Sequence, residues 1–184
     1  MRRLRPDLPS TSNRTRASKN RAWSQDRLPN PLTHWRLELP KHRAVMPLFI
    51  ETYRGTVGQA DCDDLGHMNV QHYFAAISNG MFAMMSRLGL TPEEIQRRQM
   101  SFAVVHAETD FQRELRSGDV MLLESTVLKL GDKSATFQHR LRNLSTNCLA
   151  MTTDFKCVLL DLRGREAIPI PDDIRAIAAE LAAA

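Results

Sequence analysis

Hydrophobic and polar residues follow one period before residue 100 and another after it. Between residues 70 and 88, apolar side chains recur every three or four positions, which is typical of one face of a helix. These positions are Val70, Tyr73, Phe74, Ile77, Met81, Met84, Met85 and Leu88. Asn69 is the expected N-cap of this helix and Gly89 its expected stop. Gly80 and three alanines make the helix narrow, so we expect it to pack closely on a flat partner.

A second, shorter helix is expected after Thr91, which would cap it, with Pro92 in the first turn and Glu94 completing a capping box. After residue 100 the hydrophobic period becomes two, which predicts strands. Two strands are expected over 101–113 and 119–130. Two more contain the alternating sets Ala135, Phe137, His139, Leu141 and Leu149, Met151, Thr153, Phe155, Cys157, Leu159.

A further strand is expected over residues 48–57, a tight turn at 131–133, and a short alanine-rich helix after Pro171. One strand, one long helix and a run of antiparallel strands together predict an α+β domain over residues 47–184. No apolar run approaches the ~18 residues of a membrane span, which excludes an integral membrane protein with helical spans.

Basic residues are concentrated in the first quarter of the chain. Residues 1–45 hold 11 Lys and Arg against 3 Asp and Glu, a net charge of +8. Residues 46–184 hold 14 against 18, a net charge of −4. Because the predicted domain is mildly acidic, its composition argues against a nucleic-acid-binding function.

Residues 1–46 show no hydrophobic period, and six of the nine prolines fall at or before Pro47. Such a segment cannot bury enough surface to offset its chain entropy. Three interpretations stay open: a disordered basic tail, a targeting peptide rich in Arg and Ser, or a protein whose true first residue is Met46. A nucleic-acid or membrane-surface role carried by this tail would be sensitive to salt.

The chain has three cysteines, Cys62, Cys148 and Cys157, in no C-x-x-C spacing. An odd number of cysteines without an apolar signal-peptide core indicates a reducing compartment. We therefore expect a cytoplasmic protein.

The stretch Asp61-Cys62-Asp63-Asp64-Leu65-Gly66-His67-Met68-Asn69 lies directly before the long helix. A helix N-terminus presents unpaired N–H groups and a partial positive charge, which suit an anion or a carbonyl oxygen that becomes anionic during a reaction. A carboxylate a few residues upstream can approach the same place. Together they would supply a base or nucleophile and an oxyanion site without a Ser-His-Asp triad.

The residues alone leave other interpretations of this loop open. Asp-rich turns before helices commonly do no more than cap the helix and face solvent. Asp61, Asp63 and Gly66 match three positions of an EF-hand loop, but Leu65 and His72 fail at two others, so calcium binding is disfavoured.

Zinc binding through Cys62, His67 and His72 lacks any recognised ligand spacing. Cys62 as a nucleophile would suit a helix N-terminus, since thiolates are favoured there. It would also need a histidine base in a fixed relation, which the sequence does not show.

These residues resemble the 4-hydroxybenzoyl-CoA thioesterase family of the hotdog fold. The family signature is an aspartate, a second aspartate two residues later, then Gly-His-x-Asn and an aromatic residue. In this chain the matching residues are Asp61, Asp63, Gly66, His67, Asn69 and Tyr73. Two later stretches also resemble the family, Phe111-x-x-Glu114-Leu115-x-x-Gly118-Asp119 and Gly131-x-Lys133-Ser134. The resemblance covers about residues 48–165.

The resemblance implies an antiparallel sheet of five or six strands wrapped around one long helix, here residues 70–88. It implies a homodimer with active sites at the interface, or a homotetramer of two such dimers. Acyl-CoA is the implied substrate, with no cofactor and no metal.

Carried over residue by residue, the family's catalytic aspartate falls on Asp63. Its oxyanion donor, a backbone N–H, falls on Val70 in the first helical turn. His67 and Asn69 match the Gly-His-x-Asn signature and are expected to shape the turn or to position water.

Three further residues are expected to contact substrate. Tyr73 matches the aromatic position, and Lys133 matches a basic residue that contacts the CoA nucleotide in some members. Arg113 is a candidate to meet the CoA phosphates, although a solvated face is the simpler reading of its charge. Asp64 departs from the family, which has proline at that position in the benzoyl-CoA branch.

The sequence thus predicts hydrolysis of an acyl-CoA thioester to a free carboxylic acid and CoA, with Asp63 as base or nucleophile. The alternative is a hotdog protein that binds acyl-CoA without hydrolysing it. The carboxylate of Asp63 argues against this alternative, because a pure binder has no need of it.

Overall fold

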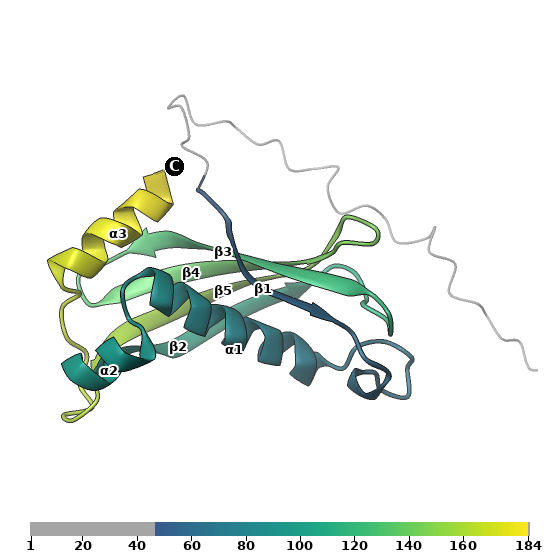
Figure 1. The fold of residues 1–184 in the computed structure, drawn as a ribbon, viewed down its shortest axis with the longest axis horizontal. Coiled ribbons are helices and arrows are strands. Elements are labelled where there is room, and N and C mark those ends of the chain that lie inside the picture. Colours follow the sequence, from purple (N-terminus) through teal and green to yellow (C-terminus); the bar gives the residue numbers. More distant parts are fainter. Residues whose placement is uncertain (1–46, 184) are drawn as a thin grey trace, which may run out of the picture. The chain divides into compact units, whose positions relative to one another are not determined.

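The computed structural model describes residues 47–183, and the expectations for residues 1–46 lie outside that range. Five strands form one antiparallel sheet in the order β1-β3-β4-β5-β2, and α1 runs along one face of it (Figure 1). The elements are β1 (Ile50–Thr56), a 3-10 helix (Gln59–Asp61), α1 (Val70–Arg87), α2 (Pro92–Arg98), β2 (Met100–Phe111), β3 (Val120–Leu130), β4 (Ser134–Asn143), β5 (Cys148–Asp161) and α3 (Asp172–Ala183). This arrangement confirms the predicted α+β class and the expected elements.

Helix α1 begins and ends where the sequence predicts. The Asn69 side chain accepts a hydrogen bond from the Gln71 N–H at 3.1 Å, which makes Asn69 the N-cap. Gly89 follows the helix with a φ of +82°, a left-handed conformation that stops the helix and that glycine adopts without strain. Within residues 47–183, no helix is both long enough and apolar enough to cross a membrane.

Helix α2 has the expected cap but not the expected capping box. The Thr91 hydroxyl accepts a hydrogen bond from the Glu94 N–H at 3.3 Å. The Glu94 carboxylate pairs with Arg97 one turn later and does not return to the Thr91 backbone. An ion pair with a neighbouring arginine has therefore replaced the second half of the box.

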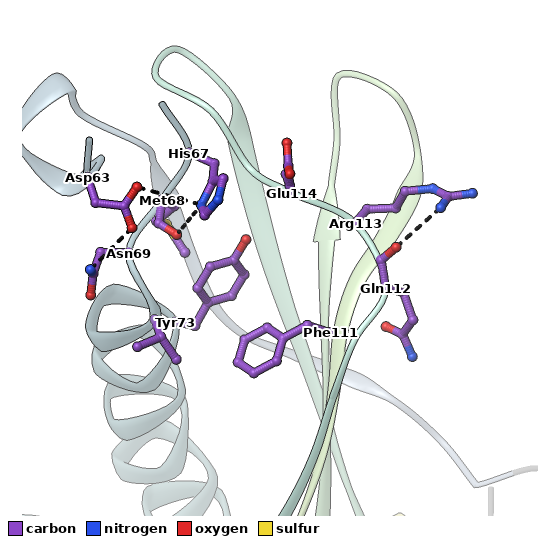
Figure 2. Close-up of a pocket in the computed structure, with 10 residues that line it drawn as sticks. Asp63, His67, Met68, Asn69, Tyr73, Phe111, Gln112, Arg113 and Glu114 are labelled. Carbon is purple, nitrogen blue, oxygen red and sulfur yellow. Dashed lines mark hydrogen bonds and ion pairs between the residues drawn. The ribbon is translucent and has the colours of Figure 1, made fainter. Parts of the chain in front are cut away.

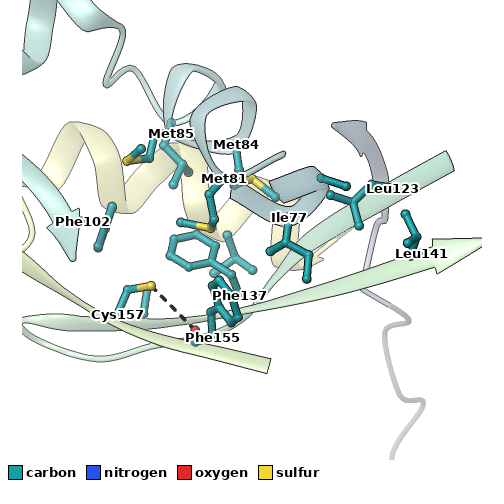
Figure 3. Close-up of a cluster of buried hydrophobic side chains, with 14 of the residues drawn as sticks. Ile77, Met81, Met84, Met85, Phe102, Leu123, Phe137, Leu141, Phe155 and Cys157 are labelled. Carbon is teal, nitrogen blue, oxygen red and sulfur yellow. Dashed lines mark hydrogen bonds between the residues drawn. The ribbon is translucent and has the colours of Figure 1, made fainter. Parts of the chain in front are cut away.

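The hydrophobic core lies between α1 and the inner face of the sheet, as Figure 3 shows. Gly80 is the closest approach, because a Cβ there would overlap the Leu123 side chain and lie 3.0 Å from the Thr52 hydroxyl. Two residues of the predicted apolar face, Val70 and Phe74, are not in the core and are 51% and 38% exposed. They lie on the flank of α1 that the sheet of this chain leaves open.

One predicted strand pattern changes at a β-bulge. Leu141 of β4 pairs with Met151 of β5, but the next residue, Arg142, pairs with Leu149. The extra residue, Ala150, is buried, whereas Leu149 is only half-buried. The predicted alternation therefore holds from Met151 onward and fails at Leu149. The extra residue of the bulge moves the side chains on its N-terminal side to the opposite face of the sheet.

A row of polar side chains crosses the inner face of the sheet beneath α1. Thr52 hydrogen-bonds Ser125 at 2.7 Å, and Ser125 hydrogen-bonds His139 Nδ1 at 2.7 Å. The row continues on the same face, where Thr153 pairs with His139 across β4 and β5 and shares a hydrogen bond of 2.6 Å with Thr109. His139 is fully buried, and its Nε2 has no hydrogen-bond partner within residues 47–183.

Burial lowers the pKa of His139 from its ordinary value of 6.5 to about 4. In the unfolded chain this histidine takes up its proton near its ordinary pKa, so between pH 6.5 and 4 the unfolded state binds more protons. The stability that depends on a neutral His139 is therefore complete above pH 6.5 and declines as the pH falls, by roughly 3 kcal/mol in total.

We predict that the free energy of unfolding of the wild type falls more steeply between pH 6.5 and 4 than that of His139→Gln. Glutamine does not titrate in this range, so the difference between the two curves isolates the histidine. Urea unfolding at several pH values measures it, and parallel curves would contradict a buried neutral His139.

Candidate active site

A tight loop of residues 61–68 connects the 3-10 helix to α1. Its two limbs meet at an isolated bridge between Cys62 and Met68, and the Asp63 N–H donates to the His67 carbonyl at 3.1 Å. Gly66 turns the loop with a φ of +80°, and its N–H donates to the Asp63 carbonyl at 2.9 Å. These backbone bonds close the loop, so Asp63 is held in a fixed place.

The Asp63 carboxylate is anchored at both oxygens but stays accessible. Its Oδ1 accepts from the Leu65 N–H at 2.9 Å, and its Oδ2 accepts from the Asn69 side-chain amide at 3.3 Å. The Asp63 side chain is 28% exposed. His67 Nδ1 lies 3.9 Å from Asp63 Oδ1, which is an ion-pair distance and too long for a hydrogen bond.

The N-terminus of α1 lies directly beside this carboxylate. The Asn69 side chain caps the Gln71 N–H, and the His72 N–H donates to the Asn69 carbonyl at 3.0 Å. The N–H of Val70, the first helical residue, donates to no group within residues 47–183. An unpaired N–H at the positive end of an 18-residue helix can bind an oxygen that carries negative charge.

A cavity of about 370 Å³ opens at this point, between the N-terminus of α1 and the segment that follows β2 (Figure 2). Its lining combines the loop, the first turn of α1 and the residues after β2. The lining residues are Asp63, His67, Met68, Asn69, Val70, Tyr73, Phe111, Gln112, Arg113 and Glu114. The cavity therefore brings together segments that are some 40 residues apart in the chain.

Six of the seven site residues expected from the sequence line this cavity. They are Asp63, His67, Asn69, Val70, Tyr73 and Arg113. Lys133 does not line it. This residue lies in the turn between β3 and β4, where its carbonyl accepts from the Leu159 N–H at 2.9 Å. The cavity lies by the start of β3 and Lys133 by its end, so the contact of Lys133 with CoA stays a prediction.

Tyr73 forms a wall of the cavity, and its hydroxyl already has a partner. The hydroxyl accepts a hydrogen bond from the Leu115 N–H at 3.1 Å. Burial is the main cause that raises the pKa of Tyr73, so the phenol stays neutral. Its ring meets that of Phe111 edge-on, with centroids 5.3 Å apart. Tyr73 can therefore contact a substrate with its ring, while its hydroxyl holds the segment after β2.

The sequence patterns predicted no functional role for two polar residues of the cavity, Gln112 and Glu114. The one sequence feature that pointed to Glu114 is its place in the stretch that resembles the family. In the structure its carboxylate pairs with Arg116 at 3.2 Å. Within residues 47–183, the Arg113 guanidinium makes one hydrogen bond, to the carbonyl of its neighbour Gln112 at 3.2 Å, and it points away from Asp63 (Figure 2).

A family model described as the thioesterase-like superfamily matches residues 57–177, which is more than half of the chain. The chain belongs to this superfamily. The match spans the loop, α1 and all strands except β1. No curated protein sequence matches the chain.

Solved structures give the same answer for the fold. A Staphylococcus aureus protein in complex with CoA superposes with a TM-score of 0.67 at 18% identity, over 73% of this chain and 85% of that chain. A 1,4-dihydroxy-2-naphthoyl-CoA thioesterase from Synechocystis gives 0.61 at 19% identity, over 70% and 95%. A DHNA-CoA thioesterase from S. aureus gives 0.65 at 12% identity, over 73% and 91%. At these identities the likeness shows the fold alone, which is the hotdog fold.

The hydrogen bond between Tyr73 and Leu115 should be important for stability. Replacing Tyr73 by phenylalanine leaves the buried Leu115 N–H without a partner, which costs about 1–3 kcal/mol. We predict a lower free energy of unfolding for Tyr73→Phe by this amount, measured by urea unfolding. Ser78→Ala, an exposed change on the same helix, serves as control, and equal stability of the two variants would contradict the assignment.

Proposed function

We propose that the protein hydrolyses an acyl-CoA thioester to a free carboxylic acid and CoA. One observation carries this proposal. An accessible carboxylate, Asp63, and an unpaired backbone N–H, that of Val70, line the same cavity at the N-terminus of α1. Membership of the thioesterase-like superfamily supports the same reaction class.

The chemistry of a thioester suits this sparse set of groups. The leaving thiol has a pKa near ~8.5 by analogy with cysteine, so it departs as a thiolate with little help from an acid. The demanding step is attack on the carbonyl carbon, which places negative charge on the carbonyl oxygen. The Val70 N–H and the positive end of α1 stabilise that charge. Elsewhere, loss of one such donor costs ~10²–10³ in rate.

Asp63 promotes attack on the carbonyl carbon in one of two ways. As a general base it takes a proton from water, whose oxygen bonds to the carbonyl carbon before the C–S bond breaks. As a nucleophile it attacks the carbonyl itself and forms an anhydride, which water then hydrolyses. Both routes need the carboxylate in the same place, and the Asn69 amide holds it there at 3.3 Å. His67 borders the same space and orients water or substrate.

The rest of the substrate extends from this point. The rings of Tyr73 and Phe111 and the side chains of Met68 and Val70 give the cavity an apolar wall for the acyl group or the pantetheine arm. The Arg113 guanidinium, with no carboxylate partner among the described residues, is placed to meet a CoA phosphate.

The cysteines bear on the compartment. Cys62, Cys148 and Cys157 are all free thiols. Their reduced state agrees with a cytoplasmic enzyme, which we propose. Microscopy or fractionation of the full chain checks this, and recovery in an oxidising compartment would contradict it.

We also propose that the working form is a homodimer or homotetramer. Strand β2 is one of the two edge strands of the sheet and has 12 residues, of which Val104 and Val105 are 48% and 56% exposed. Long apolar edge strands in soluble proteins are normally covered. In addition, Lys133 lies at the end of β3 away from the cavity of its own chain, where it would be available to a CoA nucleotide bound to another subunit. We predict a dimer or larger assembly in sedimentation velocity at micromolar concentration, and a monomer would contradict the proposal.

The central test is Asp63→Asn, assayed by thiol release from a panel of acyl-CoAs. Asparagine keeps the shape and can still accept from the Leu65 N–H, but it can neither take a proton from water nor attack the carbonyl. We predict a fall in kcat of about 10²–10⁴. Circular dichroism and thermal unfolding should show an intact fold.

The control is Asp64→Asn, a change at the neighbouring carboxylate, which does not line the cavity. Near-normal turnover by Asp63→Asn would refute the role of Asp63. Binding of acyl-CoA by the wild type without thiol release from any member of the panel would favour a non-catalytic acyl-CoA-binding protein.

A further inference from the structure

A second Asp–His pair lies next to the cavity without lining it. Asp61, two residues before Asp63, has its Oδ1 3.4 Å from Nδ1 of His72, in the first turn of α1. Both side chains are about one-third exposed. Neither residue is among those that line the cavity.

Asp61 connects the loop to the segments on both sides of it. Its Oδ2 accepts from the Gly58 N–H at 2.7 Å, which fixes the entry to the 3-10 helix. Its backbone carbonyl accepts from the Asn69 N–H at 2.8 Å, which joins the two limbs of the loop. Its Oδ1 faces His72 on α1. Asp61 therefore joins the segment directly before Asp63 to Gly58, which follows β1, and to helix α1.

This arrangement connects directly to the carboxylate that the proposed reaction needs. The Asn69 N–H donates to the Asp61 carbonyl, and the Asn69 side-chain amide donates to the Asp63 carboxylate. Apart from Asn69, the loop's side-chain link to α1 is the Asp61–His72 pair, so this pair helps to fix the place of the loop relative to the helix. A displacement of the reacting group by about 1 Å can cost ~10² in rate, so such a link affects catalysis without contact to substrate.

We propose that Asp61 is a positioning residue, which acts with His72 to hold Asp63 at the N-terminus of α1. This inference rests on the thioesterase function proposed above. It gives a role to the first aspartate of the Asp-x-Asp pair and to His72. Metal binding does not explain the pair, since no group of three potential metal ligands occurs within residues 47–183.

The test compares Asp61→Ala, Asp61→Asn and His72→Ala by steady-state thiol release. Asp61→Ala should lower kcat by roughly tenfold to a hundredfold and change KM by less than about twofold, because the CoA-binding groups stay in place. Asp61→Asn should recover most of the rate, since its amide can accept from Gly58 and donate to His72. His72→Ala should resemble Asp61→Ala.

A matched control separates positioning from loss of stability. Asp173 also joins two elements, through its ion pair of 2.8 Å with Arg98, but it lies in α3, in a different part of the fold. Asp173→Ala should lower the melting temperature and leave kcat unchanged. In addition, Asp61→Ala should cost no further activity in the Asp63→Asn background, because the group that it positions is already lost.

Equal kcat for Asp61→Ala, His72→Ala and the wild type would overturn the inference while leaving the proposed function intact. The inference would also be overturned if Asp61→Ala lowered the rate of Asp63→Asn by the same factor as it lowers that of the wild type. Asp61 would then act independently of Asp63. If Asp61→Ala does not fold, His72→Ala and Asp61→Asn decide the question by the same criteria. An inactive wild type would instead refute the thioesterase proposal.

Discussion

The close packing of α1 against the inner face of the sheet determines where every group of the candidate site lies. Gly80 allows this approach, because the Leu123 side chain occupies the space that a Cβ would need. Ile77, Met84 and Leu88 are fully buried along the same face. The N-terminus of this helix meets the loop and the segment after β2, where the cavity opens. The place of the proposed oxyanion site thus depends on core packing.

Asn69 links the packed helix to the groups of the candidate site. Its backbone N–H binds the loop, its side-chain oxygen caps the helix, and its side-chain amide holds Asp63. A capping residue normally satisfies only one helical N–H. Here the cap also fixes the distance between the carboxylate and the free N–H of Val70. The two groups that the proposed reaction needs are therefore positioned by one side chain.

The site and the core make opposite use of polar groups. Beneath α1, Ser125 and His139 are buried and Thr52 is half-buried, and burial keeps the histidine neutral. At the N-terminus of α1, the side chains of Asp63 and His67 are more than a quarter exposed and contact solvent. The same helix thus covers a polar row in the core and ends beside the polar cluster of the candidate site. The open flank of α1 at Val70 and Phe74 marks the boundary between the two.

Much of the fold could be predicted from the sequence because its signals are local. The spacing of three and four along α1, the Asn69 cap and the alternation from Ala135 to Leu141 depend only on residues a few positions apart. The loop that carries Asp63 could also be located, because its residues are contiguous and match a known signature. The sequence therefore determined the elements and the place of the candidate side chains in the chain.

Other features depended on which strands pair and in which register, and no local pattern contains that information. The bulge at Ala150 reversed the face of Leu149, and the hydroxyl of Tyr73 bound Leu115, 42 residues away. Gln112 and Glu114 joined the cavity, and Lys133 was placed at the far end of β3, because of how β2 and β3 fold back on the sheet. The tertiary structure alone decided these positions, since they arise from contacts between segments that are distant in the chain.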